Sequence, residues 1–157
     1  MSLLQKDETL SASTEVRASA AAIYAVVSDV TRIPEWSPET VRAEWVAPDR
    51  FNAWNRRRLG RWRTVAKVVE AEPAQRFSFI VQVMGGDWTQ WTYLIEPGSS
   101  ADATRLTEEI RMCVPMPFTV LAFERLLLFV WDRRTDLQHN LQVSVDRIRT
   151  IVEAGIR

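Results

Sequence analysis

Residues 61–96, RWRTVAKVVEAEPAQRFSFIVQVMGGDWTQWTYLIE, decide the fold of this chain. β-Branched and aromatic side chains dominate the stretch, and turn residues at Pro73 and at Gly85-Gly86 divide it into three runs. Short runs of this composition, separated by tight turn signals, are typical of neighbouring antiparallel strands. The stretch therefore predicts the central part of an antiparallel meander.

The same composition continues on both sides of this stretch, from Val41 to Cys113. Further turn residues follow at positions 48–49, 60 and 97–98, so that each run is about 8 to 12 residues long. We expect six consecutive strands, near residues 41–47, 51–58, 61–71, 76–84, 87–96 and 104–113.

One more strand and two short helices are predicted before the meander. The segment from Leu10 to Arg17 alternates as a strand does, and Ser19 is expected to cap an Ala-rich helix over residues 20–28. Thr31 is expected to cap a second short helical turn near Pro34.

A long helix is predicted at the C-terminal end. Apolar side chains recur there at spacings of three, four and seven, at Val130, Leu137, Leu141, Val145, Ile148 and Val152. A meander alone cannot bury both of its faces, so this helix should lie across the concave face of the sheet. The sequence predicts an α+β helix-grip fold, in which a curved seven-stranded antiparallel sheet wraps around the C-terminal helix. We expect one domain over residues 1–157, with residues 1–8 as a disordered tail.

Charge and cysteine content limit the partners and the location. Lysine and arginine number 20, as do aspartate and glutamate, and a nucleic-acid-binding protein would show an excess of positive charge. No nucleic-acid partner is therefore expected. Cys113 is the only cysteine and cannot form an intramolecular disulfide, and the N-terminus lacks a signal-peptide pattern, so we expect a cytoplasmic protein.

No metal or cofactor is expected. His139 is the only histidine and should face solvent on the last helix, and a single histidine with a single cysteine makes no zinc ligand set. Gly85-Gly86 is expected to form a hairpin turn, because neither GxGxxG nor a P-loop motif is present to hold phosphates.

Residues 118–131 form the most apolar stretch of the chain, although they include Glu124 and Arg125. The stretch is too short to cross a bilayer, which takes about 20 apolar residues, so no transmembrane segment is expected. A helix that is apolar nearly all round covers another apolar surface. Three interpretations stay open: a plug under a cavity portal, a contact in a homodimer, or a lid that touches the membrane transiently. Monomer and homodimer both fit.

Strand parity predicts which side chains face the cavity between sheet and helix. Charges rarely point inward unpaired, so the neighbours of the charged positions should point inward. Asn55 is added as a hydrogen-bonding group, and Phe123 and Leu127 are added from the apolar 118–131 stretch. The predicted ligand-binding residues are therefore Asn55, Trp62, Phe79, Trp91, Tyr93, Met112, Phe123 and Leu127.

Glu108 is the one carboxylate that parity places on an otherwise apolar inward face. Desolvation there would raise its pKa towards values useful for acid or base catalysis, which makes it the candidate catalytic residue. The alternatives are that Glu108 pairs with Arg56 or Arg58, or lies in water at the open end of the barrel. Asn55 and Tyr93 could equally satisfy neighbouring strand groups instead of a ligand.

Several motifs resemble one known family. The opening, with residues 19–24 SAAAIY and 35–38 EWSP, resembles the START-like polyketide cyclase/dehydrase and lipid-transport family. The segments 61–64 RWRT, 69–73 VEAEP and 104–108 TRLTE resemble the sheet of the same family. The resemblance covers residues from about 9 to 152 and implies a ligand-binding helix-grip domain, but fold likeness alone assigns no reaction.

Three functions are compatible with these residues. The first is binding of a hydrophobic small molecule, lipid-like or polyketide-like, in an internal cavity. The second is an enzyme of the polyketide cyclase or dehydratase kind that uses a cavity acid or base. The third is a protein interaction module that uses the apolar 118–131 helix.

Overall fold

The computed structural model describes residues 4–115, 118–123, 126–127 and 132–156. The strands are β1 (Thr9–Val16), β2 (Thr40–Ala47), β3 (Arg50–Arg57), β4 (Gly60–Glu72), β5 (Arg76–Val83), β6 (Gly86–Pro97) and β7 (Thr104–Met112). The helices are α1 (Ala20–Val27), the 3-10 helix η1 (Val30–Glu35), α2 (Phe118–Phe123) and α3 (Arg133–Ala154). Each predicted strand is present, and no strand end differs from its prediction by more than one residue.

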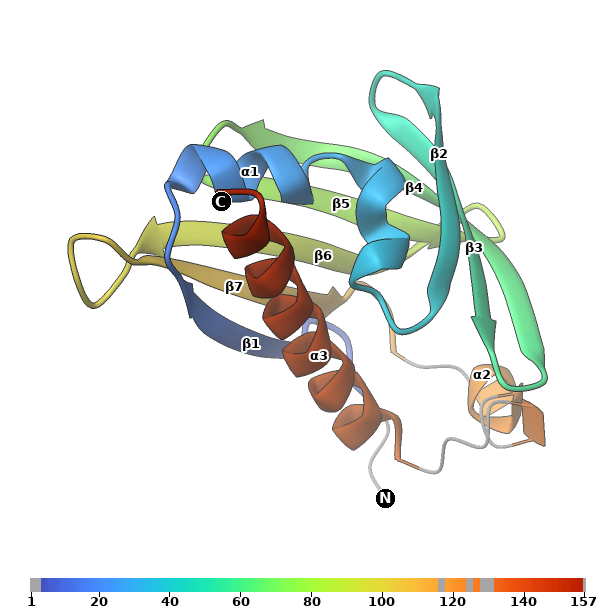
Figure 1. Cartoon of the computed structure of the whole chain (residues 1–157). Coiled ribbons are helices and arrows are strands. Elements are labelled where there is room, and N and C mark those ends of the chain that lie inside the picture. Colours follow the sequence, from blue (N-terminus) through green and yellow to red (C-terminus); the bar gives the residue numbers. More distant parts are fainter. Residues whose placement is uncertain (1–3, 116–117, 124–125, 128–131, 157) are drawn as a thin grey trace.

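The described residues form a seven-stranded antiparallel sheet in the order β1-β7-β6-β5-β4-β3-β2. From β2 to β7 each strand pairs with the next one along the chain, and β1 pairs with β7 at the edge of the meander. Figure 1 shows α3 lying across one face of this curved sheet, with α1 and η1 above it. The predicted helix-grip fold is confirmed.

Helix α3 packs through the apolar stripe that the periodicity predicts. Leu137, Leu141, Val145, Ile148 and Val152 are all buried, against β1, β7 and α1. Full burial of such a side chain is worth about 1.5–3 kcal/mol each, so this stripe is a major part of the core.

Capping residues set the helix ends. The Ser19 hydroxyl accepts a hydrogen bond from the Ala22 amide at 3.1 Å, as predicted. The prediction that Thr31 caps η1 is wrong, because Asp29 is the cap: its carboxylate accepts from both the amide and the hydroxyl of Thr31. At α3 the cap is Asp132, which accepts from the Thr135 amide. The helix thus begins after the apolar stretch, and Val130 lies outside the described residues.

The N-terminal segment differs from the disordered tail expected for residues 1–8. Leu4 is 2% exposed and belongs to the core, and the Asp7 amide donates to the Met112 carbonyl at 2.7 Å. The Met112 amide in turn donates to the Glu8 carbonyl at 3.0 Å. These hydrogen bonds continue the pairing with β7 through the residues just before β1, and residues 1–3 lie outside the described part.

Among the described helices, none has the length and apolarity that crossing a membrane requires.

Candidate functional site

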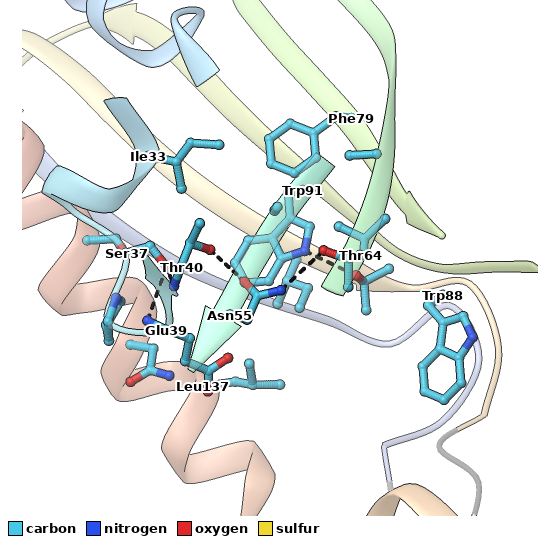
Figure 2. A pocket seen from close by; sticks show the side chains of 18 of the residues that line it. Ile33, Ser37, Glu39, Thr40, Asn55, Thr64, Phe79, Trp88, Trp91 and Leu137 are labelled. Carbon is cyan, nitrogen blue, oxygen red and sulfur yellow. Dashed lines mark hydrogen bonds between the residues drawn. The ribbon is translucent and has the colours of Figure 1, made fainter. Parts of the chain in front are cut away.

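A cavity of about 360 Å³ lies between the inner face of the sheet and the N-terminal half of α3. Apolar side chains of β3 to β7 make most of its wall, and η1, the loop before β2 and α2 complete it. In Figure 2, Phe79 and Trp91 lie on the sheet side, whereas Leu137 reaches in from α3. The strand alternation predicted from the charged positions is what turns these rings inward.

The structure brings most of the predicted site residues together. The cavity wall includes Asn55, Trp62, Phe79, Trp91, Tyr93, Met112, Phe123 and Glu108. Leu127 is the exception, since it lies outside this wall, is 39% exposed, and its carbonyl accepts a hydrogen bond from the Leu59 amide at 3.2 Å. Leu127 therefore contacts the turn between β3 and β4.

Glu108 lies on the inner face of β7 and is only 2% exposed. It pairs across the sheet with Tyr93 of β6, whose hydroxyl donates a hydrogen bond to its carboxyl group. The same hydroxyl accepts from the indole Nε1 of Trp36 at 3.1 Å. A chain of hydrogen bonds thus runs from Trp36 through Tyr93 to Glu108. Its last atom, Glu108 Oε2, is buried and has no hydrogen-bond partner among the described residues.

Burial raises the pKa of Glu108 to about 8, and the hydrogen bond from Tyr93 opposes the rise only in part. The pKa of Tyr93 is raised well above its usual value by burial and by the negative charge of Glu108. No arginine contributes to the Glu108 shift, and Arg56 lies exposed on the outer face. The pairing with Arg56 or Arg58 considered for this carboxylate is therefore not what holds it.

Two further polar residues line the cavity from α3, Asn140 at 9% exposed and Ser144 at 4%. The Ser144 hydroxyl donates to the Trp36 carbonyl at 3.4 Å, whereas no side-chain partner of the Asn140 amide lies within the described ranges. Neither residue is among those predicted from the sequence. Their signal was their spacing, because they interrupt the apolar stripe of α3 on its buried side.

Asn55 is held by its strand neighbours. Its side-chain oxygen accepts from the Thr40 hydroxyl at 2.8 Å, and its amide donates to the Thr64 hydroxyl at 3.2 Å and to the Trp62 carbonyl at 3.4 Å. Figure 2 shows Asn55 between Thr40 and Thr64. The alternative that Asn55 satisfies neighbouring strand groups agrees with this geometry.

Four charged side chains form a cluster at one rim of the cavity: Glu39 before β2, Arg57 at the end of β3, and Arg133 and Asp136 in the first turn of α3. Glu39 and Arg133 also line the cavity. Arg133 contacts Glu39 at 2.8 Å and Asp136 at 2.7 Å, and Arg57 contacts both carboxylates. The side chains are between 12% and 23% exposed. Hydrogen bonding to Asp136 raises the pKa of Arg57. We refer to these four residues as the rim cluster.

The apolar 118–131 stretch contributes to the wall through its described part. Val120 and Phe123 line the cavity, and the Phe123 ring meets Trp62 of β4 edge to face, with centroids 6.0 Å apart. Residues 124–125 and 128–131 lie outside the described residues. The plug, the homodimer contact and the membrane-touching lid therefore all stay predictions for this stretch.

Together, the curved sheet, the long helix across it and the apolar cavity between them define a START-like helix-grip protein. The sequence profile of the family described as polyketide cyclase / dehydrase and lipid transport matches residues 7–146. The chain belongs to this family, and the resemblance noted from its motifs is confirmed.

Solved structures with the same fold span nearly the whole chain. A Polyketide_cyc-like protein from Corynebacterium glutamicum is 25% identical, covers 98% of this chain and 96% of its own, and has a TM-score of 0.55. A START superfamily protein from Mycobacterium smegmatis is 19% identical, with coverage of 91% and 98% and a TM-score of 0.63. An aromatase/cyclase from a Streptomyces species is 12% identical, with coverage of 96% and 96% and a TM-score of 0.67. The comparison with curated proteins gives no match.

Proposed function

We propose that this protein binds a small, largely apolar molecule that carries one polar group, inside the cavity between the sheet and α3. The observation that carries the proposal is an apolar cavity with a buried, unpaired carboxyl oxygen in its wall. Ligand cavities range from about 300 to 1,000 Å³, so a volume near the lower end suits a molecule of two or three rings or one short chain. A lipid with two long chains would not fit.

The polar groups of the cavity favour a neutral ligand oxygen. Because its pKa is about 8, Glu108 is protonated at neutral pH and can donate a hydrogen bond. Asn140 and Ser144 add an amide and a hydroxyl from α3. A ketone, phenol or alcohol would complement these groups, whereas a ligand carboxylate would meet no arginine at Glu108. The fold relative described as an aromatase/cyclase supports an aromatic ligand.

We also propose that the protein is cytoplasmic.

Filling the cavity should abolish this binding. Val81 lines the cavity from β5, and its neighbour Ile80 lies on the other face of the strand. In Val81→Trp the indole would occupy the ligand's space, so affinity for an apolar aromatic fluorophore should fall by roughly tenfold or more. Ile80→Trp is the matched control and should bind as the wild type does.

The measurement is a fluorescence titration with a naphthalene-type probe, with thermal unfolding of both variants recorded in parallel. Equal affinity in wild type and Val81→Trp, with both proteins folded, would show that the probe does not enter the cavity and would rule out the proposed site.

A second candidate function is acid or base catalysis by Glu108, favoured by its pKa of about 8 and its place in the cavity wall. Such an enzyme would protonate a ligand carbonyl or remove a proton beside it. Glu108→Gln retains shape and hydrogen bonding but not proton transfer, so turnover of a poly-β-keto model compound should disappear while probe binding persists. Unchanged turnover in Glu108→Gln would remove the carboxylate from the mechanism.

A further inference from the structure

The turn between β3 and β4 is the most basic segment of a chain that has no net charge. Residues 56–63, RRRLGRWR, place arginines on both sides of Leu59-Gly60. Arg56 and Arg61 face each other in the strand register and are exposed, as is Arg63. Within the part of the chain that the structure describes, Arg56, Arg61 and Arg63 take part in no ion pair. A local excess of unpaired positive charge results.

Exposed leucines lie at the same place. Leu59, at the apex of the turn, is 70% exposed, and its amide donates to the Leu127 carbonyl at 3.2 Å. Leu126, the neighbour of Leu127, is 73% exposed. Figure 1 shows the β3–β4 turn beside α2, at the end of the molecule away from the β2–β3 turn. We define Arg56, Leu59, Arg61, Arg63 and Leu126 as the hairpin tip.

We propose that the hairpin tip docks onto a membrane surface that contains anionic phospholipids. Apolar side chains at an apex, flanked by arginines, are the arrangement of peripheral membrane anchors: the leucines enter the acyl boundary while the guanidinium groups contact lipid phosphates. Arginine suits this contact because its planar group binds phosphate through two hydrogen bonds. A nucleic acid would use the same cations but would leave Leu59 and Leu126 in water.

The hairpin tip also adjoins the cavity. Trp62, between Arg61 and Arg63, points to the inner face of β4 and contacts Phe123 of α2, and both rings line the cavity. One hairpin thus presents cations outward and a cavity wall inward. Docking would bring the wall formed by Trp62 and Phe123 next to the lipid, from which an apolar ligand could enter without crossing water. The docking itself does not depend on the proposed ligand.

Flotation of the full-length protein with vesicles tests the proposal. We expect binding to vesicles made of equal parts phosphatidylglycerol and phosphatidylcholine, weaker binding at high ionic strength, and little binding to phosphatidylcholine alone. Each basic residue near an anionic surface is worth about a fivefold change in partitioning, so Arg56→Gln/Arg61→Gln should bind about 25-fold more weakly. Leu59→Asp should also lose binding, and its exposed position makes a folding defect unexpected.

The matched controls lie near the opposite end of β3, away from the hairpin tip. Arg50 and Lys67 face each other on the same outer face, so Arg50→Gln/Lys67→Gln removes equal charge away from the tip. Val46, 58% exposed near the β2–β3 turn, gives Val46→Asp as the apolar control. Both should float as the wild type does. Three outcomes would each overturn the proposal. These are an equal loss of vesicle binding in the controls, equal binding to neutral vesicles, and salt-sensitive binding to an oligonucleotide without vesicle binding.

Discussion

Glu108→Gln is expected to be more stable than the wild type above pH 8, by about 5 kcal/mol, and about equally stable below pH 4.5. The pKa of Glu108 is about 8 in the folded protein and 4.5 in its ordinary state. Below pH 4.5 this carboxyl group is protonated in both the folded and the unfolded chain, so it does not change the free energy of unfolding. Between 4.5 and about 8 only the unfolded chain releases the proton, which lowers the free energy of unfolding by about 1.4 kcal/mol per pH unit.

Denaturant unfolding at a series of pH values measures this difference. The wild-type free energy of unfolding should fall relative to that of Glu108→Gln across the whole window and level off above pH 8. Glu109, the next residue on β7, points to the opposite face and gives Glu109→Gln as the control, which should follow the wild type. Parallel curves for wild type and Glu108→Gln would mean that Glu108 titrates as an exposed carboxylate does.

Glu108 also shows how far the sequence alone could lead. Strand alternation is a local property with a period of two, so the charges Arg105 and Arg111 on the outer face were enough to place Glu108 inward. The same reasoning placed Trp62, Phe79 and Trp91 in the cavity wall, and the turn residues located the strands.

Contacts between distant elements could not be predicted in this way. The hydrogen bond from Trp36 to Tyr93 joins residues 57 positions apart, and Arg133 binds Glu39 across 94 positions. Each partner on its own has the sequence signature of an ordinary surface charge or core aromatic. The first pair depends on how η1 lies against the sheet and the second on how α3 crosses it, and no periodicity encodes either arrangement. The same holds for Leu4, whose burial depends on the edge formed by β1 and β7.

The rim cluster leads to the second large effect, since Asp136→Asn should destabilise the protein by about 3 kcal/mol. Asp136 is one of the two carboxylates that both Arg57 and Arg133 contact, and its side chain is 12% exposed. Removing one partner of a nearly buried ion pair costs about 3–5 kcal/mol, because the opposite charges stay desolvated. The expected loss lies at the lower end of this range, because Glu39 still contacts both arginines in the variant.

The matched control is the exposed pair of Arg32 and Glu35, whose side chains are 37% and 44% exposed. Glu35→Gln should cost less than about 1 kcal/mol, because solvent screens this pair.

The rim cluster joins the start of α3 to β3 and to the segment before β2, so Asp136→Asn should also speed the release of a cavity-bound fluorophore in stopped-flow measurements. An Asp136→Asn protein as stable as Glu35→Gln would show that the rim cluster is solvated like a surface pair. In that case the cluster could not be what closes the cavity at this end.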